Sequence, residues 1–162
     1  MKIKIFTTGG TIDKTYATDK GTVNFSFGNP AIKELLDKKL KIGFTFDIKN
    51  LLSKDSTEMT EEDRLLVKKA CEKSDSSKIL ITHGTDTMID TAKVLASIKN
   101  KVIILTGSSL PYVFKDSDAD FNIGVAIGGL NILENGVYIS MNGRIFPWNK
   151  CQKTQEGRFI EL

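Results

Sequence analysis

Cysteine and histidine are scarce in this sequence, and their scarcity excludes several kinds of protein. The 162 residues contain two cysteines, Cys71 and Cys151, and a single histidine, His83. Two cysteines so far apart cannot form the disulfide framework of a small secreted domain, so we expect a reduced, cytoplasmic setting. One histidine cannot build a histidine-rich metal site, and we therefore expect no metal.

Long apolar runs, charge of one sign and phosphate-binding motifs are also missing. No apolar run approaches the length of a membrane span, and no signal-like segment precedes the first apolar stretch. The 23 Lys and Arg against 20 Asp and Glu give a net charge of +3, with no basic block. We therefore expect neither a membrane nor a nucleic acid as partner. Neither Gly-x-Gly-x-x-Gly after the first β-prone run nor a Walker-type motif occurs, so we expect no cofactor.

Short β-prone runs alternate with helical patterns along the whole chain. The length suits one domain, which we expect to cover residues 1–162. The expected strands are 2–6, 41–52, 78–82, 101–105 and 137–141, and the expected helices are 29–40, 60–73, 89–98 and 119–134. This alternation predicts an α/β fold, a flavodoxin-like parallel sheet with helices on both faces in three layers. Residues 13–27 are expected to form a loop or loose hairpin, and the tail 142–162 shows no clear period.

Three of the expected strands end in loops rich in threonine, serine and glycine. These loops are residues 7–12 (TTGGTI), 82–87 (THGTDT) and 106–109 (TGSS). Because ligands bind beyond the carboxyl ends of parallel strands, we expect the loops to meet at one crevice. A threonine hydroxyl is a weak nucleophile, and a lysine whose pKa is lowered by burial can serve as its base. The residues alone predict a hydroxyl-rich small-ligand site and name no substrate.

Each of these features also has a structural interpretation. Gly9–Gly10 could form no more than a tight turn. Asp86 could cap the helix that follows it. His83 is expected to be structural, hydrogen-bonded to backbone, and the acidic run 116–120 is expected to be a solvated loop and helix start rather than a metal site.

The motifs at 8–12 (TGGTI) and 82–87 (THGTDT) together resemble the two signatures of the bacterial-type L-asparaginase family. They occur in the family's order, and each follows a strand-like run. Residues 55–59 (DSTEM) are similar to the family's substrate loop. Residues 136–142 with Lys153 and Thr154 are similar to the strand and loop that carry its catalytic lysine. The resemblance covers nearly the whole chain.

The resemblance implies hydrolysis of L-asparagine to L-aspartate and ammonia through an acyl-enzyme intermediate. Thr11 matches the usual nucleophile of the family. Thr85, Asp86 and Lys153 match its second catalytic set. Tyr16 is the candidate for the mobile tyrosine that partners the nucleophile.

The resemblance also implies a set of substrate-binding residues. Ser56, and with it Thr57, matches positions that hold the substrate's α-carboxylate and amine, and Asp86 shares the amine. Gly10 is expected to line the substrate, and backbone N–H groups at Gly84–Thr85 are expected to stabilise the oxyanion.

The sequence departs from the family pattern in its length. Family members usually carry a second, smaller domain, and a neighbouring subunit's second domain contributes an acidic residue to the site, whereas this sequence stops at Leu162. We therefore expect a single-domain form that assembles as a homodimer. Its candidate substrates are L-asparagine and L-glutamine. Two alternatives stay open: a non-catalytic module that binds aspartate or asparagine, and an amidase subunit resembling that of archaeal-type tRNA amidotransferases.

Overall fold

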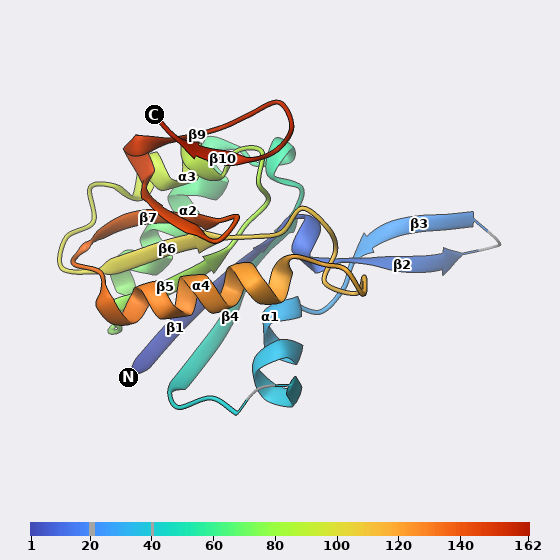
Figure 1. Cartoon of the computed structure of the whole chain (residues 1–162), viewed down its shortest axis with the longest axis horizontal. Coiled ribbons are helices and arrows are strands. Elements are labelled where there is room, and N and C mark those ends of the chain that lie inside the picture. Colours follow the sequence, from blue (N-terminus) through green and yellow to red (C-terminus); the bar gives the residue numbers. More distant parts are fainter. Residues whose placement is uncertain (20–21, 40) are drawn as a thin grey trace.

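The computed structural model describes residues 1–19, 22–39 and 41–162, and within them a six-stranded sheet forms the centre of the molecule (Figure 1). The strands lie side by side in the order β4 (Thr45–Lys54), β1 (Lys2–Gly9), β5 (Lys78–Thr82), β6 (Val102–Thr106), β7 (Gly136–Met141) and β8 (Arg144–Pro147). Neighbours from β4 to β7 are parallel, and β8 is antiparallel to β7. Counted along the chain, the parallel strands have the order 2-1-3-4-5 of flavodoxin-like sheets, which confirms the predicted fold class.

Helices cover both faces of this sheet, as predicted. One face carries α2 (Glu61–Lys73) and α3 (Met88–Leu95). The other carries α1 (Ala31–Glu34), its π-helical continuation Leu35–Lys39, and α4 (Ala119–Ile132). In Figure 1, α4 crosses the sheet on the side nearer the viewer. The molecule therefore has three layers.

Burial on both faces explains why the central strands are almost continuously apolar. In β5, Ile79 and Ile81 belong to the core beneath α2 and α3, whereas Leu80 belongs to the core beneath α1 and α4. All three side chains are fully buried. A strand covered on both sides needs apolar residues at every position, which is typical of parallel sheets.

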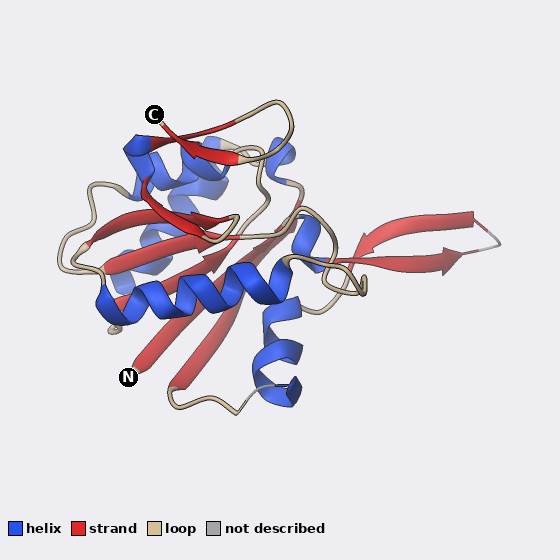
Figure 2. Ribbon diagram, in the orientation of Figure 1, coloured by secondary structure: helices blue, strands red, loops and turns tan. Residues whose placement is uncertain are grey.

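Several predicted elements are confirmed in detail. α2 begins with a capping box, in which the Thr60 hydroxyl accepts from the Asp63 N–H and the Asp63 carboxylate accepts from the Thr60 N–H. The hairpin predicted between residues 13 and 27 consists of β2 (Lys14–Asp19) and β3 (Thr22–Phe27), and Figure 2 shows it projecting from the body of the molecule. The helix expected over 29–40 begins at Ala31, and its expected last residue, Leu40, lies outside the described residues.

The tail contains structure that the sequence pattern did not predict. The strand expected to be the last, β7, is followed by β8, by a 3-10 turn (Trp148–Lys150) and by an antiparallel pair, β9 (Cys151–Lys153) with β10 (Phe159–Glu161). These strands are short and have few buried side chains, so alternation of apolar residues does not reveal them.

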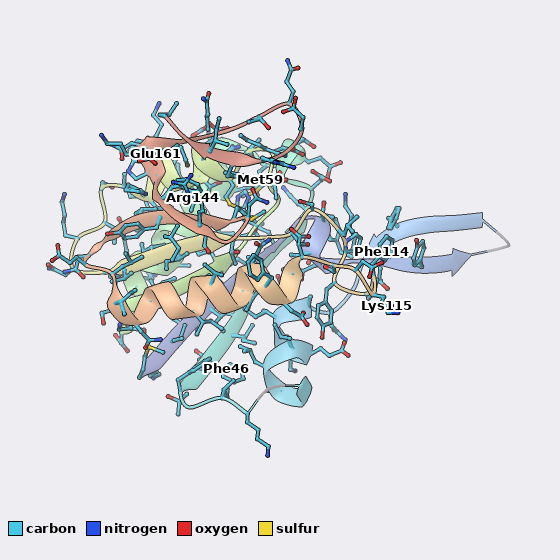
Figure 3. All side chains as sticks on the ribbon, viewed as in Figure 1. Phe46, Met59, Phe114, Lys115, Arg144 and Glu161 are labelled. Carbon is cyan, nitrogen blue, oxygen red and sulfur yellow. The ribbon has the colours of Figure 1, made fainter. Side chains whose placement is uncertain are left out.

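Polar contacts attach the β9–β10 pair to the sheet. Asn142, which has a left-handed backbone at φ 54°, accepts a hydrogen bond at 2.8 Å from the Phe159 N–H. Arg144 and Glu161, both labelled in Figure 3, form an ion pair at 3.0 Å between β8 and β10. Since both side chains of that pair are exposed, the Asn142 bond is the more significant anchor.

The outer face of α4 has few charged side chains. It carries no charged side chain between Asp120 and Glu134, and it exposes Phe121 (59%) and Ile132 (82%). Among the described residues no helix is both long enough and apolar enough to cross a membrane.

Candidate functional site

The hydroxyl-rich loops lie at one edge of the sheet because the strands that precede them are neighbours. β1, β5 and β6 are adjacent, with Thr7 beside Thr82 and Thr82 beside Thr106. The chain order reverses between β1 and β5, and ligands bind at this switch point in doubly wound sheets. The structure therefore brings the loops together as the sequence predicted.

The glycines of these loops allow their backbones to touch. Gly10 has φ 82° and ψ −179°, a conformation adopted almost exclusively by glycine. A Cβ atom on Gly10 would lie 2.4 Å from Gly84 N, and one on Gly84 would lie 2.6 Å from Ser56 Oγ. Gly10 precedes Thr11, and Gly84 precedes Thr85. The candidate nucleophile, the second threonine and the substrate loop are thus held against one another by backbone packing.

A Gly10→Ala variant is expected to be destabilised and to lose most of its activity. The added methyl group would force the two loops apart and would place alanine in a disfavoured backbone conformation, at a combined cost of roughly 2–4 kcal/mol. Urea unfolding and an ammonia assay would measure the two effects.

Gly124→Ala is the matched control for this variant. Gly124 lies in α4, where an added Cβ would meet nothing within 4 Å. Alanine is the better helix former there, so stability should rise by about 0.5–1 kcal/mol. A Gly10→Ala protein as stable and active as Gly124→Ala would contradict the role assigned to the loop contact.

Lys153 connects the loop after β5 to the tail. Its Nζ donates to Thr85 Oγ1 at 2.9 Å and to Asp86 Oδ1 at 2.5 Å. The lysine side chain is largely buried, at 22% exposure, whereas that of Asp86 is 56% exposed. Because Thr85 Oγ1 accepts from Lys153, its own proton is directed away from the lysine. The structure thus brings Thr85, Asp86 and Lys153 together.

The alternative interpretation of Asp86 as a helix cap is wrong. Thr87 occupies the N-cap position of α3, its side chain makes no capping hydrogen bond, and the Asp86 carboxylate is engaged by Lys153 instead. Lys153 in turn pairs with Phe159 in the β9–β10 ladder, which Asn142 anchors. Asn142 thus helps to hold the strand that carries Lys153, a role that sequence reasoning missed although the dipeptide Asn142-Gly143 is typical of a two-residue hairpin turn with left-handed backbone.

The two residues predicted to hold the substrate's polar groups differ in their surroundings. Ser56 is 1% exposed, and in the described part of the chain its Oγ has no hydrogen-bond partner. Its carbonyl accepts from Thr87 Oγ1 at 2.7 Å, which fixes the turn. A buried hydroxyl without a partner is costly, so Ser56 Oγ is well suited to contact a ligand. Thr57 is exposed, and its N–H and Oγ1 both donate to Asp55 Oδ1.

Sequence reasoning also missed the ion pair between Lys14 and Asp55. Lys14 Nζ lies 2.7 Å from Asp55 Oδ2 and links the base of the β2–β3 hairpin to the turn that carries Ser56. The hydrogen bond from Lys14 holds the pKa of Asp55 below its usual range. No spacing in the sequence indicates this contact, because it joins residues from separate loops.

Tyr16 packs against two other aromatic side chains. It is part of β2 and is 51% exposed, and its ring stacks on Phe25 at 5.2 Å and on Phe114 at 5.4 Å between centroids. Figure 3 shows Phe114 beside the hairpin. Among the residues that the structure describes, no hydrogen bond joins Tyr16 to Thr11.

The predicted structural role of His83 agrees with the geometry, and the acidic run contributes to the hydrogen bonds of its own loop. The His83 ring is buried between Gly84 O and Thr91 Oγ1. In the acidic run, Asp118 accepts hydrogen bonds from the N–H groups of Ser109 and Leu110. Within residues 1–19, 22–39 and 41–162, no cluster of His, Cys, Asp or Glu is arranged to hold a metal.

Asp13, two residues after Thr11, is a buried carboxyl group. It is 6% exposed, and its Oδ1 accepts from the Ala31 N–H at 2.8 Å, so it caps α1 from a distant part of the chain. Burial raises its pKa from 3.8 to about 7, although the bond from Ala31 acts in the opposite direction. Asp13 is therefore protonated in mildly acidic solution and ionised in alkaline solution.

Asp13→Asn is expected to flatten the pH dependence of stability. Because the folded-state pKa is raised, the stability from protonated Asp13 is complete below pH 3.8 and is lost as the pH rises through about 7. Above that pH the asparagine variant should be the more stable protein by roughly 2–4 kcal/mol, whereas at pH 4 the two should be similar. Urea unfolding of both proteins across this pH range would test the prediction. A difference in their free energies of unfolding that does not change with pH would contradict it.

The fold and the site at the carboxyl ends of β1 and β5 together define a class of protein. It is a doubly wound α/β protein that carries threonine and lysine side chains at the switch point of its sheet. Comparison with known proteins then identifies the family. The family model for the N-terminal domain of asparaginases ("Asparaginase, N-terminal") matches residues 2–160. The chain therefore belongs to the asparaginase family.

Individual relatives agree with this assignment. The chain is 30% identical over 160 residues to the L-asparaginase of Thermococcus kodakarensis, covering 94% of this chain and 48% of that protein. It is 29% identical over 158 residues to a glutaminase-asparaginase of Acinetobacter glutaminasificans, covering 89% of this chain and 47% of that protein. The solved T. kodakarensis structure gives a TM-score of 0.85 at 27% identity and covers 100% of this chain and 51% of that one. A probable cytoplasmic L-asparaginase from Campylobacter jejuni gives 0.81 at 26% identity, covering 99% and 51%. The chain thus spans about half the length of these relatives.

Proposed function

We propose that this chain hydrolyses L-asparagine to L-aspartate and ammonia through an acyl-enzyme intermediate on Thr11. The observation that carries the proposal is the bonding of Lys153 to both Thr85 and Asp86, at the edge where Gly10–Thr11 packs on the same loop. A site that only binds an amino acid needs hydroxyl and carboxylate groups. A lysine that donates to a threonine hydroxyl adds a route for proton transfer.

In the proposed reaction Thr11 Oγ attacks the carbon of the side-chain amide. The hydroxyl proton leaves to a base, a C–O bond forms, and the resulting oxyanion collapses with cleavage of the C–N bond. Ammonia departs with the transferred proton, and water then hydrolyses the ester to release aspartate. Thr85, which lies between Thr11's loop and Lys153, relays the proton, and the contacts of Lys153 with Thr85 and Asp86 hold this relay in place.

Tyr16 is assigned the role of partner to Thr11 in the proton transfer. This assignment requires the β2–β3 hairpin to move, because Tyr16 stacks on Phe25 and Phe114. The ring stacks involve exposed aromatic groups and are worth about 0.5–1.5 kcal/mol each, which substrate binding can overcome.

Substrate recognition is proposed to use the neighbouring loops. Ser56 Oγ, which is buried and unpartnered among the described residues, binds the α-carboxylate together with Thr57. Asp86 binds the α-ammonium group, and the backbones of Gly10 and Gly84 line the amide. Glutamine is a second candidate substrate, since one relative is named a glutaminase-asparaginase.

An ammonia assay on asparagine and glutamine, run side by side with the heat-denatured protein as blank, tests this function. Release on asparagine above the blank is the expected result. Calorimetric titration with aspartate separates the alternative, because a non-catalytic module would bind aspartate and release no ammonia.

We further propose that the chain forms a homodimer through α4. The support is the charge-free outer face of that helix, with Phe121 and Ile132 exposed. Light scattering should give twice the mass of one chain, and Ile132→Lys should reduce it to the mass of one chain. A wild-type protein that is monomeric at micromolar concentration would contradict the proposal.

We place the protein in the cytoplasm. Cys71 and Cys151 are free and buried, and the C. jejuni relative is titled cytoplasmic. Fractionation of cells that express the chain would test this location.

A further inference from the structure

We propose that His83 is a positioning residue that aims the Thr85 N–H at the carbonyl oxygen of the substrate. It does so by holding the Gly84 carbonyl through its Nδ1–H. The inference rests on the proposed hydrolysis of asparagine.

The hydrogen bonds of the ring define its tautomer. Nδ1 lies 2.7 Å from Gly84 O, and because a carbonyl oxygen can only accept, Nδ1 must carry a proton. Desolvation lowers the pKa of His83 to about 4, so the ring is neutral near pH 7 and Nε2 has a lone pair. The Thr91 hydroxyl, 2.8 Å away, donates to that lone pair. The Nδ1–H tautomer satisfies both ring nitrogens.

The geometry of the peptide bond transmits this arrangement to the site. In a planar trans peptide, the carbonyl of Gly84 and the N–H of Thr85 point in opposite directions. His83 is fully buried and holds the carbonyl toward the interior, so the Thr85 N–H points toward the edge that carries Gly10–Thr11. In the described part of the chain this N–H donates to no protein acceptor. A fixed N–H of this kind is suited to stabilise an oxyanion.

The surroundings of His83 restrict its movement. The backbone N–H of His83 donates to Thr106 O at 2.9 Å. A Cβ atom on Gly107 would lie 2.3 Å from the backbone carbonyl oxygen of His83. The charged groups that face it are Arg64 and Asp90, which act on its pKa in opposite directions. Ring and backbone are therefore fixed by β6 and α3 without an ion pair to the imidazole.

Because His83 is the single histidine of the chain, nitrogen-15 NMR reads its state without ambiguity. Protein labelled at the imidazole nitrogens should show a protonated Nδ1 and an unprotonated Nε2, unchanged between pH 5 and 8. A protonated Nε2, or titration near 6.5, would overturn the inference. This measurement needs no substrate, so it stands even if the protein releases no ammonia, a result that would contradict the proposed function itself.

A pair of variants tests the effect on catalysis. The side-chain amide of His83→Asn can place a donor close to the position of Nδ1, whereas His83→Leu removes the donor at similar volume. We expect kcat to fall about 100-fold in His83→Leu with KM changed by less than about threefold, and to recover to within about tenfold of wild type in His83→Asn. Equal losses of kcat in the two variants, or a change confined to KM, would overturn the inference. Thermal unfolding checks that each variant is folded, and if His83→Leu does not fold, His83→Asn and the NMR measurement decide.

Discussion

Replacement of Thr11 by alanine is expected to abolish ammonia release from asparagine. Thr11 Oγ is the atom proposed to form the acyl bond, and alanine has no hydroxyl with which to form it. The rate should fall by about 10⁴-fold or more, as is usual when a nucleophile is removed. Binding should persist, because Ser56 and Asp86 remain in place. Calorimetry with aspartate and an ammonia assay would show the two effects separately.

Thr45→Ala is the matched control for this substitution. Thr45 begins β4, pairs in register with Lys2 at the opposite end of the sheet, and contributes a long hydrogen bond of 3.5 Å to Met1 O. Its replacement should leave hydrolysis unchanged. If Thr11→Ala retained more than about a tenth of the wild-type rate, Thr11 could not be the nucleophile.

Replacement of Lys153 by methionine is the second large effect that we expect. Methionine fills a similar volume but cannot donate to Thr85 or form an ion pair with Asp86, the two contacts that Lys153 makes. We expect kcat to fall by about 10³-fold while the fold is retained, since general acid–base groups usually contribute this much. Thr85→Val should have a comparable effect because it breaks the same relay at its other end. Ammonia release at saturating asparagine would measure both losses.

Lys150→Met controls for the loss of a positive charge from the tail. Lys150 is exposed and lies in the 3-10 turn just before β9, and its carbonyl, not its side chain, bonds to Leu162 N–H. Its replacement should leave kcat within about twofold of wild type. Near-normal turnover by Lys153→Met would refute the proton relay, and an equal loss in both variants would point to the general charge of the tail.

Most of the sheet could be predicted from the sequence because burial leaves a clear pattern. Strands such as β6 are apolar at nearly every position, and α2 begins with a recognisable capping box at Thr60 and Asp63. The alternation of these elements then fixes a parallel sheet. β8, β9 and β10 escaped prediction because side-chain hydrogen bonds and partner strands hold them, rather than an apolar stripe.

The site could be predicted only in part for a similar reason. Thr11, Thr85 and Asp86 lie next to strand ends, so the fold class alone brings them to one edge. Lys153 lies in a short strand with no period of its own, and the residues alone gave no reason to place it there. Its assignment came from the resemblance to the asparaginase family.

The position of Tyr16 could not be predicted because contacts outside its own segment decide it. The hairpin that carries it follows Thr11 closely in sequence, which suggested that the two side chains are close in space. In the structure the ring of Tyr16 stacks on Phe114, from the loop before α4, a contact that its own segment does not indicate. Proximity along a chain does not determine the direction in which a hairpin leaves a sheet.

The attachment of the β9–β10 pair has a consequence for folding. Thr85 and Lys153 are separated by 68 residues, and we expect their contact to form only once the β9–β10 pair is held by Asn142. Contacts between such distant residues are slow to form, because a long loop must close first. During refolding, circular dichroism should therefore recover before hydrolytic activity does. Catalysis in this protein would report on the docking of its last strands, a step that the secondary-structure signal scarcely records.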